Sequence, residues 1–202
     1  MEQKNKIHLT GGIVRIHESR NMTSMTIATT VAGVNTAYPS IVFFDPDMAH
    51  GFRAGERITI DGHVQIHFTE EDGKRVYNQI IVVDEVKKAE RMLAPYIEDE
   101  NISKTDGGIQ ADENYAFIFG KIRRIYAASN GVYVLSVAVY DGKEHTNYCE
   151  IACFKRQASI AQFLQEGDFV MIGGAVQTSR KPSGKMLQNI VCRDILKCED
   201  ES

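Results

Sequence analysis

The sequence repeats itself. Residues 5–17 (NKIHLTGGIVRIH) match residues 114–126 (NYAFIFGKIRRIY) at an offset of 109, with five identical positions. Two further matches follow in the same order: GERITIDGHVQ (55–65) with GDFVMIGGAVQ (167–177), and NQIIVVDEVKK (78–88) with QNIVCRDILK (188–197), the last placing Asp84 opposite Asp194. Three matches in one order predict a duplicated domain.

A chain of 202 residues divided by this duplication gives two domains of ordinary small size. We predict domain 1 at 1–93, an acidic flexible linker at 94–113, domain 2 at 114–198 and a short acidic tail at 199–202. The chain has no apolar run of about 18 residues, and its first residues lack the apolar stretch of a signal peptide. We therefore expect a cytoplasmic protein without a membrane partner.

Charge is distributed unevenly along the chain. The net charge is −4, but residues 96–113 hold six acids against one Lys, and residues 114–198 hold 11 Lys/Arg against six Asp/Glu. Local charge governs phosphate binding more than the total does. The basic second repeat is therefore compatible with a nucleic-acid partner.

Both repeats carry mainly β signals. The second holds five β-rich runs separated by turn residues: AFIFGKIRRIY, GVYVLSVAVY, NYCEIACF, DFVMIGGAV and MLQNIVCRDIL. The one helical candidate, 155–167, lies between the third and fourth runs, and Gly167 is its expected stop. In the first repeat the corresponding segment is 45–55, where Asp45 can cap a helix and Pro46 can occupy its first position.

Five strands with a helix between the third and fourth is the order of an OB-fold barrel. We predict an all-β chain with short helices, built as two tandem five-stranded OB-fold barrels. The polar stretches 69–75 and 178–185 are the expected loops between the fourth and fifth strands.

The third strand of each repeat has an unusual outer face. Alternate side chains of a strand point to opposite sides, so Cys149, Ile151 and Cys153 face the core while Tyr148 and Phe154 face outward with Glu150 and Ala152. The first repeat places Tyr38 and Phe44 outward in the same way, with Ser40 and Val42 between them. Outward aromatic pairs can stack unpaired bases, each stacked base contributing about 1–3 kcal/mol. Burial under a loop or a second subunit is the alternative explanation for the same rings.

Basic residues are predicted to accompany these rings. In the first strand of the second repeat, Lys121 and Arg123 should point outward with Phe119, and Arg124 should follow at the turn. Others flank the same groove if the barrel is correct: Lys155, Arg156, Arg180, Lys181 and Lys185. The first repeat is weaker and offers Arg15, Lys74 and Arg75. Any one of these could be an ordinary surface charge, so the interpretation depends on the cluster.

Other chemistry finds little support in the sequence. Cys149 and Cys153 are four residues apart on a strand, with no partner pair at zinc-ligand spacing, so buried thiols are favoured over a metal site. The six histidines are scattered, and none pairs with a repeated acid or nucleophile. We therefore expect no metal, no cofactor and no enzymatic activity.

The second repeat resembles the bacterial single-stranded DNA-binding protein family over nearly its whole length. The resemblance rests on NYAFIFGKI, VLSVAVY, YCEIACFKRQA and EGDFVMIGGAVQ, and the first repeat is a more distant copy of the same pattern. It implies that Tyr148, Phe154, Tyr38 and Phe44 stack bases and that Lys121 contacts the backbone. The chain has no Trp, on which the family commonly stacks bases. This departure, together with the tail described below, fits a phage, plasmid or other mobile-element variant.

The resemblance also implies a homodimer, because family members assemble four OB domains and this chain holds two. Replication proteins are further partners that it implies, although the family recruits them through a Phe-ended acidic tip that residues 199–202 do not match.

Two functions are therefore open. The first is a protein that coats single-stranded DNA, or RNA, without sequence preference and protects it in replication or recombination. The second is an OB-fold adaptor of a replication or primosome complex, in which the outward rings bind protein.

Overall fold

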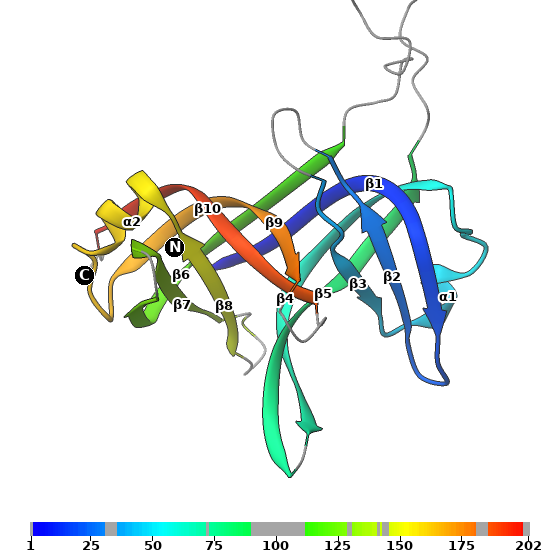
Figure 1. Cartoon of the computed structure of the whole chain (residues 1–202), viewed down its shortest axis with the longest axis horizontal. Coiled ribbons are helices and arrows are strands. Elements are labelled where there is room, and N and C mark those ends of the chain that lie inside the picture. The colour runs from blue at the N-terminus through cyan, green and yellow to red at the C-terminus, as the bar shows by residue number, and fades with distance from the viewer. Residues whose placement is uncertain are drawn as a thin grey trace, which may run out of the picture.

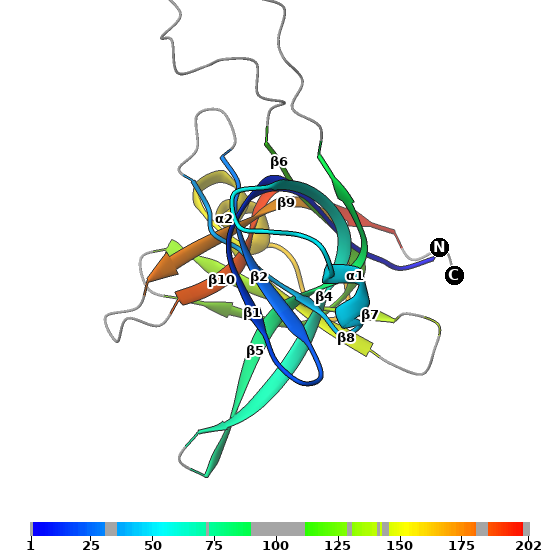
Figure 2. The same ribbon diagram turned by 90° about the vertical axis from the view of Figure 1, so that its right-hand side faces the viewer.

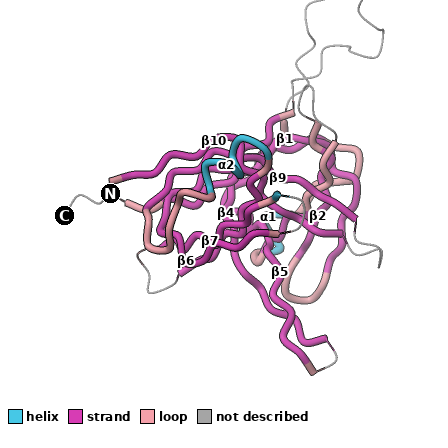
Figure 3. Tube along the Cα trace, turned by 60° about the vertical axis from the view of Figure 1, so that its left-hand side comes forward, coloured by secondary structure: helices cyan, strands magenta, loops and turns pink. Residues whose placement is uncertain are grey.

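The structure is a computed structural model that describes residues 2–30, 36–71, 73–89, 112–128, 131–140, 142, 146–180 and 186–199. The first repeat contains β1 (Lys4–Glu18), β2 (Thr23–Ala28), β3 (Ser40–Phe43), α1 (Pro46–Ala49), β4 (Arg57–Glu71) and β5 (Lys74–Lys88). The second contains β6 (Glu113–Ala127), β7 (Tyr133–Tyr140), β8 (Thr146–Cys153), α2 (Lys155–Ala161), β9 (Phe169–Arg180) and β10 (Met186–Cys198). Strands form most of the described trace (Figure 3).

Each repeat closes into a five-stranded barrel. In the first, the pairing runs β1–β2–β3–β5–β4 and returns to β1. In the second it runs β6–β7–β8–β10–β9 and returns to β6. The pairs β3–β5 and β8–β10 are parallel, and the other pairs within the barrels are antiparallel. With a helix after the third strand of each, this is the predicted tandem OB-fold (Figure 1).

The two helices begin as the sequence indicates, but both are short. Asp45 caps α1, its carboxylate accepting a hydrogen bond from the Asp47 N–H at 3.0 Å, and Pro46 follows at the first helical position. α2 ends at Ala161, well before the predicted stop at Gly167. Gly167 instead adopts a φ of +98° in the turn before β9, a conformation that glycine adopts at little cost. None of the helices in the described ranges has the length and apolar character needed to span a bilayer.

The repeated sequence motifs have structural roles. The Asn5 side chain binds the N–H and C=O of Val64 across β1 and β4, and Asn114 does the same with Val176 across β6 and β9. The buried faces of the strands fill each barrel with aliphatic side chains, joined by Cys149, Cys153 and Cys192 in the second. The predicted burial of Cys149 and Cys153 is therefore observed.

The third sequence match is displaced by one residue in the structure. A bulge in β5 leaves Asp84 without a partner in β4, because Asp61 pairs with Glu85 and Gly62 pairs with Val83. A bulge in β10 similarly leaves Arg193 without a partner in β9. Asp84 therefore lies at the position of Arg193, and the predicted match of Asp84 to Asp194 is wrong.

The barrels join through an antiparallel pairing of β1 with β6. Lys4 pairs with Phe119 and Thr10 with Glu113, so the register centres on Ile7 and Ala116. Ile7 and Ala116 are equivalent positions at the repeat offset of 109. The two repeats are therefore related by an approximate twofold axis at this pair, and all ten strands form one continuous sheet.

Each barrel also extends a hairpin to the other. The hairpin β4–β5 projects away from the body of the molecule in two perpendicular views (Figures 1 and 2). At its base the Gln79 amide oxygen accepts a hydrogen bond from the Glu150 N–H in β8 at 2.7 Å. In the hairpin β9–β10, Gln188 accepts from the Ser40 N–H in β3 at the same distance. These two contacts are symmetric equivalents, and each brings a hairpin beside the third strand of the other barrel.

Candidate nucleic-acid interface

The four predicted rings point into solvent. Tyr148 and Phe154 are 40 % and 42 % exposed, and Tyr38 and Phe44 are 46 % and 49 % exposed. Val42, expected outward between the rings of the first repeat, is only 6 % exposed. Its directly paired neighbour on β5, Val82, is also buried and lies on the same face of the sheet. Val42 therefore points to the predicted outer face, but Val82 and Val42 cover each other and exclude solvent.

Cross-strand pairing extends the outward face of β8 over β7 and β6. In antiparallel strands, directly opposite residues share a face. The register gives three rows, each from β6 through β7 to β8: Lys121–Ala138–Tyr148, Arg124–Ser136–Glu150 and Tyr126–Val134–Ala152. We call this surface the β6–β8 face. It places two cations and two tyrosines together, with Phe154 at the end of β8.

A β-bulge in β6 explains where the first-strand prediction departs from the structure. The register shifts between Ile122 and Arg124, so Arg123 is the extra residue. Because one inserted residue reverses the alternation that follows it, Arg124 and Tyr126 lie on the same face as Lys121. Arg124 is therefore inside a strand that continues to Ala127 and is not at a turn.

Phe119 is the other departure on β6. We predicted that Phe119 is exposed to solvent beside Lys121, but Phe119 is buried, with only 4 % of its surface exposed. It pairs with Lys4 where the two barrels meet, and its ring lies 6.1 Å from that of Phe169. The junction between barrels covers this position, which a single repeat read by itself does not reveal.

Tyr126 is a groove residue that the sequence reasoning missed. Its hydroxyl donates a hydrogen bond to Oε2 of Glu150 at 3.0 Å, and the Arg124 guanidinium lies 5.3 Å from its ring centre. Burial, and then the adjacent Glu150 carboxylate, raise the pKa of the Tyr126 hydroxyl. The tyrosine therefore stays neutral, and its ring is fixed in position between a cation and an anion. The sequence feature that could have identified Tyr126 is its position as the last residue of the β-rich run AFIFGKIRRIY.

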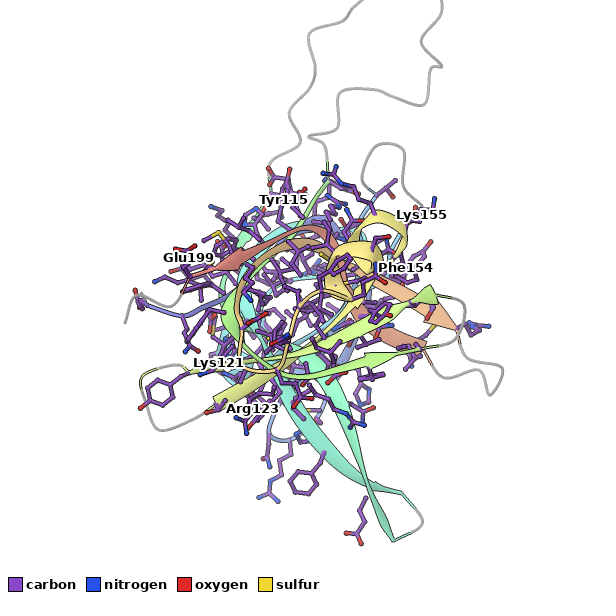
Figure 4. All side chains as sticks on the ribbon, turned by 90° about the vertical axis from the view of Figure 1, so that its left-hand side faces the viewer. Tyr115, Lys121, Arg123, Phe154, Lys155 and Glu199 are labelled. Carbon is purple, nitrogen blue, oxygen red and sulfur yellow. The ribbon has the colours of Figure 1, made fainter. Side chains whose placement is uncertain are left out.

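Lys121 lies at the other end of the face from Phe154. Its ammonium is 5.4 Å from the centre of the Phe169 ring. In Figure 4, Lys121 and Arg123 lie low in the view, whereas Phe154 and Lys155 lie together on the opposite side. The cations and rings of the face are thus spread from the Lys121–Tyr148 row to Phe154, as a path for an extended chain requires.

A groove of about 900 Å³ runs over this face and is completed by the other barrel. Tyr126, Tyr148, Glu150 and Phe154 line it from the second repeat, and residues of the β4–β5 hairpin, including Gln79 and Ile80, line it from the first. The Gln79 contact with Glu150 ties this second wall to β8. The groove therefore depends on both repeats being present.

The corresponding face of the first repeat is poorer in rings and charge. Its register gives the rows Gly12–Ala28 and Arg15–Thr26–Ser40, and His17 pairs with Ser24. Arg15 thus occupies the position of Arg124, but Gly12 replaces Lys121, His17 replaces Tyr126, and Ser40 replaces Glu150. Both faces have an arginine at this position, Arg15 in the first repeat and Arg124 in the second.

The remaining predicted residues are dispersed. Lys155 is exposed next to Phe154, and Arg180 is exposed at the end of β9. Arg156 lies in a separate hollow beside Phe117, Met171 and Arg193, away from the groove. Lys181 and Lys185 lie outside the described residues, and Lys74 and Arg75 are placed in β5 by their backbone alone. The structure therefore brings together Lys121, Arg124, Tyr148 and Phe154, but not the whole predicted cluster.

Comparison with known proteins supports the fold. No family model and no curated protein matches the sequence. Among solved structures, the wild-type single-stranded DNA-binding protein from Thermus aquaticus superimposes with a TM-score of 0.71 at 13 % identity, covering 100 % of this chain and 96 % of that one. A deletion mutant of the same protein gives 0.70 at 14 % identity, covering 100 % and 97 %. The chain therefore has the tandem OB-fold architecture of a single-stranded DNA-binding protein, which confirms the sequence resemblance at the level of the fold.

Proposed function

We propose that this chain binds single-stranded DNA with little regard to sequence, and coats and protects it during replication or recombination. The observation that carries the proposal is the β6–β8 face, where exposed rings and cations share one continuous surface. Bases would stack on Tyr126, Tyr148 and Phe154, while Lys121 and Arg124 contact phosphates. This combination of stacking platforms and nearby positive charge is the usual chemistry of single-strand binding by OB-folds.

The length of the face suits an extended strand. Phe154, the extended residue directly after β8, lies six residues beyond Tyr148, about 20 Å at the rise of a β-strand. That span accommodates several nucleotides, and the groove continues along it. The other predicted cations, among them Arg123, Lys155 and Arg180, would add phosphate contacts beyond it.

A direct test is intrinsic fluorescence. The chain has no Trp, so tyrosine is its fluorophore, and Tyr126 and Tyr148 line the groove. Titration with oligo(dT) at low salt should quench this emission. Affinity should fall steeply with salt, with a logarithmic slope of about 0.7 for each phosphate neutralised on a single strand. No quenching at low salt would reject the proposal.

One observation favours a second function for domain 1. Its outward face keeps Tyr38 and Phe44 but lacks the counterparts of Lys121 and Tyr126. Exposed rings with little positive charge suit a protein surface better than a polyanion. Domain 1 would then act as an adaptor for replication proteins while domain 2 binds DNA. Loss of DNA binding on replacing Tyr38 and Phe44 with Ala would contradict this division.

The quaternary state is a separate part of the proposal. A homodimer would bring together four OB domains, as the family resemblance implies. Sedimentation equilibrium should then give twice the chain mass of 22.6 kDa. A monomer at micromolar concentration would overturn this part and leave DNA binding by the β6–β8 face unaffected.

A further inference from the structure

One carboxylate lies in the middle of the groove. Glu150 is at the centre of the β6–β8 face, two residues along β8 from Tyr148 and in the same row as Arg124. Its main chain is held independently of its side chain, because Gln79 binds both its N–H and its C=O. The position of the carboxylate on the face is therefore set by the backbone.

The carboxylate retains hydrogen-bonding capacity. Its Oε2 accepts from the Tyr126 hydroxyl at 3.0 Å. Among the described residues, no hydrogen bond to Oε1 and no ion pair with Arg124 is present. A carboxylate is an acceptor only, and each oxygen can receive more than one hydrogen bond. The groove thus presents a negative, partly free acceptor between its stacking rings.

A groove that bound only phosphates would not place a negative charge at this position. Phosphates would avoid Glu150, and the adjacent rings would bring base edges to the floor of the groove. The first repeat has Ser40 at this position, a neutral group that both donates and accepts. The fold therefore does not require an acid, and the acid distinguishes the outward face of the second repeat from that of the first.

We propose that Glu150 reads the base lying over it, and favours bases that present an exocyclic amino group, such as cytosine, over thymine. This inference rests on the proposed function of the groove. A Glu side chain accepts a hydrogen bond from the cytosine N4 amino group. Thymine places the O4 carbonyl at that point, and its N3–H lies between two carbonyls that repel the carboxylate. The resulting preference is superimposed on stacking that is otherwise tolerant of sequence.

The test compares oligo(dC) with oligo(dT) of equal length at moderate salt and mildly alkaline pH, where oligo(dC) stays unstructured. We expect the native chain to bind oligo(dC) about fivefold more tightly, near the lower end for discrimination by a base-edge contact. Glu150→Gln keeps the size of the side chain and an acceptor for Tyr126, but adds a donor that suits thymine O4. This variant should bind both oligomers about equally.

Tyr126→Phe is the matched control, because it retains the ring and removes the hydroxyl that binds Glu150. Its preference for oligo(dC) should persist. Equal binding by the native chain, or an unchanged preference in Glu150→Gln, would overturn the inference while leaving the proposed function intact. Loss of preference in Tyr126→Phe alone would assign base reading to the tyrosine hydroxyl and also overturn it. If neither oligomer binds the native chain, the proposed function fails and this inference fails with it.

Discussion

Single glycines set how closely neighbouring strands approach in this fold. A Cβ atom on Gly11 would lie 2.3 Å from the carbonyl oxygen of Ala28, and one on Gly120 would lie 2.3 Å from that of Ala138. Both positions belong to the repeated motif of the first strand. The repetition of this glycine is therefore explained by backbone packing, and it is not evidence of a contact with a ligand.

Gly11 and its neighbour Gly12 make a matched pair of variants. Gly11→Ala should lower the free energy of unfolding by about 1–3 kcal/mol, because the new methyl group must displace a backbone carbonyl. Gly12→Ala should change it little, because a Cβ there meets no atom within 4 Å. Urea unfolding of both variants measures the difference. Equal stabilities would contradict the close strand packing at Gly11.

At the scale of elements, the sequence predicted regular strands well and irregular ones poorly. The alternation through β3 and β8 and the extended residues beside them correctly predicted outward Tyr38, Phe44, Tyr148 and Phe154, because these short strands run without a bulge. It failed after Ile122, because a bulge is decided by hydrogen bonding between strands that a one-dimensional pattern does not contain.

The contacts between the barrels also could not be predicted from the sequence. Gln79 and Gln188 look like ordinary polar strand residues, and only the docked hairpins show that each binds the third strand of the other repeat. The wall that these hairpins add to the groove was therefore not predicted. The structure shows this contact twice, at equivalent positions of the two repeats.

The hairpin contacts make a reciprocal prediction. Gln79→Ala should accelerate hydrogen exchange of the Glu150 amide, because that N–H loses its acceptor, an effect worth about 0.5–1.5 kcal/mol in local opening. The Ser40 amide should be unchanged in the same variant. Gln188→Ala should produce the opposite pattern. Exchange rates that do not respond in this way would show that the hairpins are not held by these amides in solution.

A histidine links the two barrels. Nδ1 of His8 lies 2.7 Å from an Asp61 carboxylate oxygen, and Nε2 lies 3.0 Å from one of Glu113 in the second repeat. Two carboxylates accept two N–H donors only when the imidazole is protonated. Burial lowers the pKa of His8, but the hydrogen bonds to Asp61 and Glu113 outweigh it, so the pKa is raised above 6.5. The hydrogen bond from His8, followed by that from Thr10, lowers the pKa of Glu113 below 4.5.

The sign of the pH dependence follows from these shifts. A raised histidine pKa stabilises the fold fully below pH 6.5, and this contribution is lost as pH rises through the folded-state value. A lowered glutamate pKa stabilises the fold above pH 4.5, and this contribution is lost as the pH falls through the folded-state pKa of Glu113. The link between the barrels should therefore be strongest between these two pH values.

His8→Gln should accordingly destabilise the chain most between pH 4.5 and 6.5, and progressively less at higher pH. Urea midpoints measured across this range test the prediction. His50→Gln, which changes an exposed histidine at the end of α1, is the control and should show no such trend. A destabilisation by His8→Gln that does not change with pH would mean that the imidazole is neutral in the folded state.

If single-stranded DNA stacks on the β6–β8 face, the ring of Phe154 carries one of the stacked bases. Phe154→Ala should weaken oligo(dT) binding by about 1–3 kcal/mol, the value of one stacked base. The control is Phe163→Ala, which removes a ring that is 78 % exposed just beyond α2 and outside the groove. It should leave binding unchanged. Native affinity in Phe154→Ala, or an equal loss in both variants, would show that DNA does not stack on this face.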